Sequence, residues 1–193
     1  MHPCKVMILR PSVFLRRFAL GRALGALALV FGLMSAAAPA ADNTSGLPIP
    51  RFVTTRSSPI NVRVGPGTKY GIAWVYVRAG VPVEIIQEFD TWRKIRDVDG
   101  STGWLHQNLL TGKRVAIVTA AATADGQVAM RAHPDSTAAL VAWLVSGVEV
   151  ELKSCDGTWC RISVTPPVDG APRYDGYIEQ QTLWGAYKGE VFD

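Results

Sequence analysis

The sequence predicts an all-β protein built from two small β-barrels that follow one another along the chain. Three observations lead to this prediction: short segments alternate apolar and polar residues, glycine- and aspartate-centred turns separate them, and the whole pattern occurs twice. Beyond an apolar N-terminal leader, the sequence has no long helical period. Short and evenly spaced strands of this kind are typical of small barrels.

The first 40 residues form a leader that we expect to be removed. Five basic residues and no acidic one accompany an apolar stretch from Ala23 to Ala40. Ala38-Pro39-Ala40 offers an A-x-A cleavage site before Ala41, as in secretory signal peptides. An uncleaved membrane anchor is the alternative, but the apolar core is shorter than the roughly 20 residues that a span needs. We therefore expect a periplasmic or secreted protein with no stable membrane span after cleavage near Ala40–Ala41.

Loss of the leader changes the charge of the protein. The chain has 20 basic and 16 acidic residues, and with five basic residues in the leader, 15 basic and 16 acidic ones remain. The basic character therefore belongs to the export signal and does not indicate nucleic-acid binding. Residues 51–114 are rich in basic side chains and 115–193 in acidic ones. This asymmetry is either ordinary surface variation or a sign that the halves attract each other or differently charged partners.

A linker over 41–50 precedes two repeats, which we place at 51–118 and 119–193. Their landmarks occur in the same order in both halves. The corresponding segments are "NVR" (61–63) and "AMR" (129–131), "DTWRKI" (90–95) and "DGTWCRI" (156–162), and "GWLHQNLL" (103–110) and "GYIEQQTL" (176–183). An offset of about 70 residues indicates duplicated small domains, since solenoid repeats are shorter.

Each repeat reads as short strands and tight turns. Residues 148–152 alternate three apolar residues with two glutamates, and 81–85 repeat this pattern, with Glu84 expected on the solvent face. The turn signals are Gly65-Pro66-Gly67, Asp99-Gly100, Asp156-Gly157 and Asp169-Gly170. Domains of about 70 residues are near the lower size limit for independent folding. We therefore expect the two repeats to pack against each other and to stabilise each other.

Two cysteines, Cys155 and Cys160, follow the leader in the segment "CDGTWC". Export to an oxidising compartment favours their pairing across the Asp-Gly turn. The spacing is not the C-x-x-C of redox motifs, and no histidine lies nearby to complete a metal site. We expect a structural disulfide worth about 2 kcal/mol, with no metal and no cofactor.

The segment "NVRVGPGTKYG" (61–71), the tryptophan at 92 and the "GW" pair at 103–104 with Leu110 resemble the bacterial SH3 domain family. The second repeat is similar but looser, because His133-Pro134-Asp135 replaces the Gly-Pro-Gly turn. With the leader, the pair resembles exported two-module proteins of alphaproteobacteria. The resemblance implies two SH3-like β-barrels that serve as binding or targeting modules, often toward cell-wall material.

Trp92 and Trp159 each stand three residues before an isoleucine, Ile95 and Ile162. On a strand, residues i and i+3 point to opposite faces, so a core isoleucine places the tryptophan outside the core. An outward indole suits peptides or sugar rings. The alternative is that the ring covers a barrel end or the other repeat.

Other candidates lie in the first repeat. Trp74 and Tyr76 have equal parity, and with Tyr70 they either line a groove or belong to the core. The segment "GWLHQNLL" adds Trp104 and His106. It resembles the "GYIPSNY" segment of eukaryotic SH3 domains, in which the proline and the final tyrosine help to bind proline-rich ligands. Here these two positions hold His106 and Leu109 in the first repeat, and Glu179 and Thr182 in the second. We therefore expect no proline-rich ligand.

Arg63 and Arg131 recur at matching positions, where we expect hydrogen bonds that stabilise the barrel.

The sequence offers no catalytic constellation. His106 and His133 have no metal-ligand spacing, and no serine or cysteine stands in a nucleophile motif. We predict a non-enzymatic envelope protein that recognises peptidoglycan peptide or glycan through an aromatic groove on the first barrel. The alternative is an adaptor that docks on another envelope protein. The candidate ligand-binding residues are Tyr70, Trp74, Tyr76, Trp92, Trp104, His106 and Trp159.

Overall fold

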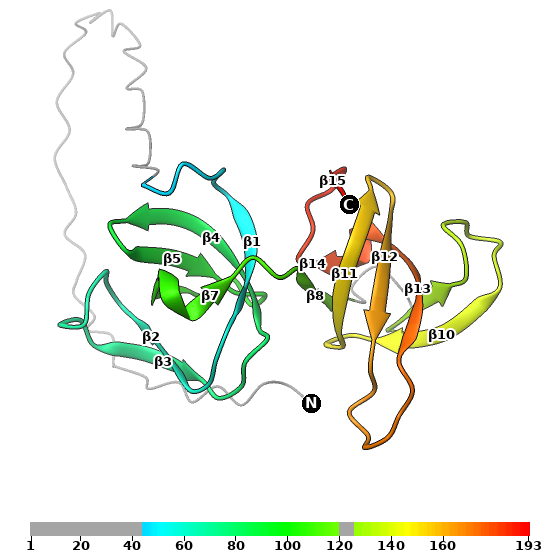
Figure 1. Ribbon diagram of the computed structural model, residues 1–193, viewed down its shortest axis with the longest axis horizontal. Coiled ribbons are helices and arrows are strands. Elements are labelled where there is room, and N and C mark those ends of the chain that lie inside the picture. Colours follow the sequence, from blue (N-terminus) through cyan, green and yellow to red (C-terminus); the bar gives the residue numbers. More distant parts are fainter. Residues whose placement is uncertain (1–43, 120–125) are drawn as a thin grey trace, which may run out of the picture.

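A computed structural model describes residues 44–119 and 126–193. The leader and its expected cleavage site lie outside the described residues. Figure 1 shows two β-structures side by side, joined by a short connection between β7 and β8. In the part of the chain that the structure describes, no helix has the length and apolar character of a membrane span. The all-β prediction is confirmed.

The first barrel contains the strands of one antiparallel sheet. They are β1 (Arg51–Thr55), β2 (Ile60–Arg63), β3 (Ile72–Tyr76), β4 (Pro82–Phe89), β5 (Trp92–Arg96), β6 (Thr102–His106) and β7 (Leu110–Thr111). A 3-10 turn, η1 (Gln107–Leu109), leads from β6 into β7. The strand order is β3-β2-β6-β5-β4-β1-β7.

The second barrel repeats this topology. Its strands are β8 (Val115–Val118), β9 (Gln127–Arg131), β10 (Leu140–Val145), β11 (Glu149–Asp156), β12 (Trp159–Val164), β13 (Tyr174–Glu179), β14 (Leu183–Trp184) and β15 (Val191–Phe192). The turn η3 (Gln180–Thr182) matches η1. The order β10-β9-β13-β12-β11-β8-β14 is that of the first sheet shifted by seven strands, and β15 pairs with β11.

The strand β8 lies in the second sheet, although the expected repeat boundary after Val118 assigned it to the first. It pairs with β11 and β14. Its alternation explains this position, because Ala116 and Val118 are fully buried in the second core while their neighbours are half-buried. The second sheet therefore begins at Val115.

Each barrel has its own core. The first contains Val53, Ile60, Val62, Val81, Val83, Ile85, Ile95, Leu105 and Leu110. The second contains Ala116, Val118, Val128, Met130, Leu144, Val150, Leu152, Cys155, Cys160, Ile162, Val164, Ile178 and Leu183. The cysteines form the expected disulfide, and both are buried.

The two matching arginines make the same contact in both barrels. Arg63 donates from Nη1 to the carbonyl of Tyr70 at 2.7 Å, and Arg131 donates to the carbonyl of Ala138 at 2.8 Å. Each bond spans the hairpin that follows the strand, so the expected structural role is confirmed. Gly103 and Gly176 also match, since a Cβ at either would lie under 3 Å from β2 or β9 atoms.

The barrels pack against each other around Phe52. Its ring lies 5.1 Å from that of Trp184, edge to face, and 4.7 Å from that of Tyr187. The Tyr187 hydroxyl donates to Glu84 at 2.9 Å. Glu84 points away from the first core, as alternation requires, but it is only 2% exposed because the second barrel and Arg96 cover it. The expected solvent position of Glu84 was therefore wrong.

Candidate functional site

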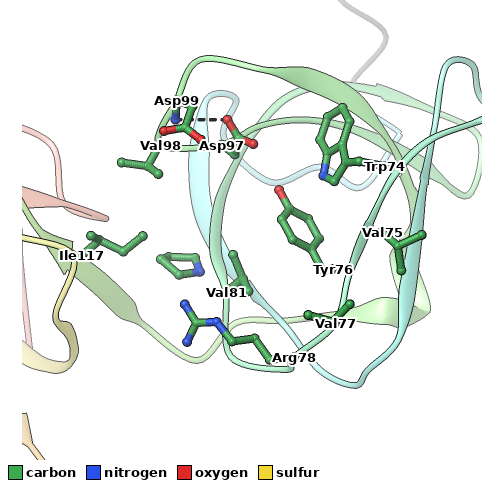
Figure 2. Close-up of a pocket in the computed structure, with 11 residues that line it drawn as sticks. Trp74, Val75, Tyr76, Val77, Arg78, Val81, Asp97, Val98, Asp99 and Ile117 are labelled. Carbon is green, nitrogen blue, oxygen red and sulfur yellow. Dashed lines mark hydrogen bonds between the residues drawn. The ribbon is translucent and has the colours of Figure 1, made fainter. Parts of the chain in front are cut away.

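A pocket opens on the side of the first barrel that faces β8 (Figure 2). We call it the Trp74 pocket, and its volume is about 120 Å³. Most of its wall is apolar, and the lining residues are Trp74, Val75, Tyr76, Val77, Arg78, Val81, Pro82, Asp97, Val98, Asp99 and Ile117. Ile117 belongs to β8, so the second barrel supplies part of the wall.

Trp74 and Tyr76 form the aromatic side of the pocket. They point to the same face of β3, and their ring centroids are 6.1 Å apart in an edge-to-face arrangement. Their cross-strand partners Val62 and Ile60 lie in the core, and both aromatic rings pack against that core. Trp74 and Tyr76 thus meet both the core and the pocket, whereas Tyr70 is not among the lining residues.

Asp97 forms the polar side, where β5 ends in the turn toward β6. Its Oδ1 accepts from the backbone N–H groups of Asp99 at 3.1 Å and Ser101 at 2.9 Å. Asp97 as a whole is only 6% exposed to solvent. In Figure 2 the Tyr76 hydroxyl points toward Asp97 and the Trp74 indole nitrogen. Burial, and then the charges of Asp97 and Asp99, raise the pKa of the Tyr76 hydroxyl far above its usual value.

Arg78 lies at the rim and connects the barrels. Its two terminal nitrogens donate to the two carboxylate oxygens of Glu149, one of them at 2.6 Å. This bidentate pair joins the basic half of the chain to the acidic half, and it neutralises the guanidinium beside the pocket. The charge asymmetry seen in the sequence thus coincides with a contact between the barrels.

The second barrel has different chemistry at the equivalent positions. The strand registers match Trp74 with Ala142, Tyr76 with Leu144, and Asp97 with Val164. All three replacements are aliphatic. The aromatic and acidic walls of the Trp74 pocket are therefore a property of the first barrel in the part of the chain that the structure describes.

Trp92 and His106 form a second aromatic pair. They are cross-strand neighbours with ring centroids 5.5 Å apart and perpendicular planes. Ile95 is fully buried, so Trp92 lies outside the core, as its spacing predicted. Trp92 begins β5 and Asp97 follows its end, so roughly 16 Å of strand separates these two residues at ~3.3 Å per residue, and neither Trp92 nor His106 lines the Trp74 pocket. The exposed Phe89 lies opposite Trp92 on β4.

Three other candidates are dispersed over the molecule. Tyr70 covers Gly65 in the β2–β3 hairpin and is 37% exposed. Trp104 is 9% exposed, so little of its ring can reach a ligand. Trp159 stands beside the disulfide in the second barrel, opposite Glu179. Of the seven predicted residues, the structure brings together Trp74 with Tyr76 and Trp92 with His106.

A comparison with protein families agrees with the structure, in which the strand topology and the arginine contacts are repeated and Trp92 lies outside the core. The family model described as "Bacterial SH3 domain" matches residues 56–112 and 124–185, which are more than half of the chain. This chain belongs to the bacterial SH3 domain family. The two matched segments correspond to the two barrels, and both are SH3 domains.

Known proteins share parts of this bacterial SH3 pair. "Putative N-acetylmuramoyl-L-alanine amidase YrvJ" of Bacillus subtilis (strain 168) is 27% identical over 110 residues, which are 54% of this chain and 21% of that protein. The chain therefore spans about a fifth of that relative's length. The structures of NlpC2 and NlpC1 from Trichomonas vaginalis align at 15% and 16% identity with TM-scores of 0.30 and 0.29. The alignment with NlpC2 covers 70% of this chain and 48% of NlpC2. The alignment with NlpC1 covers 72% of this chain and 47% of NlpC1.

Sequence reasoning missed Asp97, Asp99 and Ile117 as pocket residues. Asp99-Gly100 was recognised only as a turn signal, and barrel closure places Asp97 and Asp99 in the lining of the pocket. Ile117 comes from the other barrel, and no sequence signal connects it to β3. Within the described residues, no group of three or more His, Cys, Asp or Glu side chains is arranged to hold a metal ion.

Proposed function

We propose that this bacterial SH3 pair is an exported, non-enzymatic binding module of the cell envelope that recognises peptidoglycan through the Trp74 pocket. The N-terminal leader supports export, and a relative named for an amidase of N-acetylmuramoyl-L-alanine supports a wall ligand. The observation that carries the proposal is the pocket itself. It joins two aromatic rings and two carboxylates in a mostly apolar wall, with Arg78 at the rim.

The size of the pocket favours the peptide part of peptidoglycan over the glycan. A volume of about 120 Å³ is below the ~300–1,000 Å³ of pockets that enclose drug-sized ligands. A protruding side chain of a stem peptide fits such a space, whereas a disaccharide does not. The half-buried Trp92, beside the exposed Phe89, offers an indole that a sugar ring could stack on.

A binding role without catalysis agrees with the surroundings of the pocket carboxylates. Asp97 accepts two backbone hydrogen bonds within its own turn, which fixes it as an acceptor. Incubation of the exported protein with purified sacculi should release no soluble wall fragments. Release of muropeptides above a boiled-protein control would contradict the non-enzymatic role.

Sedimentation with purified peptidoglycan sacculi tests the proposal. We expect the exported protein to co-sediment with the sacculi. Trp74→Phe should weaken binding, whereas Trp143→Phe, at an exposed position on β10 in the second barrel, should not. Trp92→Phe reports separately on the second aromatic face. Absence of binding, or equal binding by the Trp74 and Trp143 variants, would exclude the Trp74 pocket as the wall site.

A protein–protein adaptor is the second candidate, and the edge strand β10 favours it. Among the described residues β10 pairs only with β9, and its exposed side chains include Leu140, Trp143 and Val145. An extended segment of a partner protein could add to this edge through main-chain hydrogen bonds. Capture of one envelope protein in the absence of wall material, and its loss on Trp143→Lys, would support this function.

A further inference from the structure

We infer that the Trp74 pocket takes a protonated primary amine carried on a short aliphatic stem, such as the side chain of a diamino acid residue in a peptide. This inference deepens the proposed function and rests on the same pocket. The charges in the wall, its apolar side chains and the size of the space support it.

The charged residues of the lining are two aspartates and one arginine. Arg78 already donates from both terminal nitrogens to Glu149 of the second barrel, so its positive charge is compensated outside the pocket. Asp97 and Asp99 lie together in the β5–β6 turn and give the lining an excess of negative charge. An incoming ammonium would add to the partners that these carboxylates already have, and an incoming carboxylate would be repelled.

The aromatic wall lies beside the negative charge of the pocket. Trp74 and Tyr76 stand edge to face at 6.1 Å, and the Tyr76 hydroxyl points toward Asp97 (Figure 2). The raised pKa of the Tyr76 hydroxyl, to which the charges of Asp97 and Asp99 contribute after burial, agrees with a negative potential at this point.

The shape of the pocket selects the stem that carries the amine. Apolar side chains from β3, the β3–β4 turn and β8 surround the space, and Val77 and Ile117 are among them. Such a wall suits methylene groups, and about 120 Å³ leaves room for a few of them together with one ammonium. The geometry thus favours an alkylammonium over a guanidinium with its wider planar head.

The second barrel lacks this chemistry and acts as the wall of the first barrel's pocket. Ala142, Leu144 and Val164 occupy the positions of Trp74, Tyr76 and Asp97. A peptide amine is therefore expected to bind one site per chain. Two equal sites per chain would contradict the inference.

Two peptides that differ in one amine provide the direct test. The first is acetyl-Gly-Lys-Gly-amide, and the second is the same peptide with its lysine Nε-acetylated. The readout is the NMR resonance of the Trp74 indole N–H in the exported protein, assigned with Trp74→Phe. We expect a saturable shift with the lysine peptide and at least roughly tenfold weaker binding of the acetylated one. Equal affinities, or no saturable shift, would overturn the inference.

Matched variants separate the pocket charge from the fold. Asp97→Asn keeps the Oδ1 acceptor that the turn uses, and it should weaken the lysine peptide roughly tenfold by removing the charge. Asp156→Asn makes the same change at a turn of the second barrel, where Oδ1 also accepts two backbone N–H groups, and should leave the affinity unchanged. Equal effects of the two variants would contradict a local charge contact.

Sacculi distinguish this inference from the proposed function. Native sacculi and sacculi with chemically acetylated amino groups are compared in the sedimentation assay. Binding of native sacculi alone supports both proposals. Equal binding of both preparations overturns the amine inference and leaves wall binding intact. Binding of neither overturns the proposed function, and the peptide titration then decides the amine inference by itself.

Discussion

Glu88 and Arg93 form an ion pair across β4 and β5 at the position that the disulfide occupies in the second barrel. Arg93 Nε lies 3.2 Å from Glu88 Oε1, and the two residues are cross-strand partners. Cys155 and Cys160 are the corresponding partners on β11 and β12. The two barrels thus connect the same pair of strands through a buried charge pair in one case and a covalent bond in the other.

Glu88→Gln should destabilise the first barrel by about 3 kcal/mol, because it leaves the buried charge of Arg93 without its partner. Glu88 also accepts from Ser45 and Arg51, so the segment before β1 should become more accessible to proteases. Urea unfolding measures the loss, with Glu179→Gln in the second barrel as the control. A loss no larger than that of the control would show that the pair contributes little.

Acidic pH should reduce the stability that the Glu88–Arg93 ion pair gives to the first barrel. Burial by itself would raise the pKa of the Glu88 carboxyl, but hydrogen bonds from Ser45 and Arg51 and the charge of Arg93 outweigh it and lower the pKa from 4.5 to about 2. A lowered pKa stabilises the fold fully above about pH 4.5, and this contribution is lost as the pH falls toward 2. The loss amounts to up to about 3 kcal/mol.

Unfolding measured between pH 6 and 2 checks this prediction. Glu88→Gln cannot titrate at this position, so its stability should depend less steeply on pH than that of the unaltered protein over the same range. Parallel pH profiles would mean that other carboxylates cause the acid sensitivity.

Removal of the disulfide should cost about 2 kcal/mol, since it closes only a short loop. The cysteines are buried and β15 pairs with β11 beside them, so Cys155→Ser with Cys160→Ser should also loosen the C-terminal strand. Hydrogen exchange of Phe192 and its neighbours would report this loosening, with the first barrel as an internal reference. Two reactive thiols in the exported protein would contradict the structural role of the bond.

The sequence predicted local features well because they depend on neighbouring residues. The alternation around Val150, the turns, the matched arginines and the outward position of Trp92 all follow from strand parity and turn chemistry. Glu84 could not be predicted in this way. Its partner Tyr187 lies 103 positions away, and the packing of one barrel on the other adds to the cover that Arg96 gives the carboxylate.

The Trp74 pocket shows the same limit. The sequence predicted that Trp74 and Tyr76 point to the same face of their strand. It does not decide whether a ring on that face meets the core, a ligand or another domain. That outcome depends on Asp97, which barrel closure brings near Tyr76, and on Ile117, which comes from the second sheet. Contacts between distant segments therefore made the site, and the sequence pattern named only one wall of it.

Tyr187→Phe should weaken the contact between the barrels by about 1 kcal/mol, the usual net value of a hydrogen bond. The ring contact with Phe52 would remain, and only the bond from the hydroxyl to Glu84 would be lost. Thermal unfolding measures the change, and Tyr174→Phe at an exposed position serves as the control. An unchanged melting temperature would indicate that Arg96 alone satisfies the buried Glu84.

Alkaline conditions should separate the barrels at the same contact. Burial, followed by the hydrogen bond to Glu84 and its charge, raises the pKa of the Tyr187 hydroxyl well above its usual value near 10. A raised pKa stabilises the fold below about pH 10, and the contribution declines as the pH rises further, because the phenolate would face the Glu84 carboxylate. Tyr187→Phe should reduce the loss of stability between pH 9 and 11 but not abolish it, since the Tyr76 hydroxyl is also shifted upward. Unfolding of the two chains in parallel over this range measures the difference, and coincident alkaline profiles would exclude Tyr187 as the titrating group.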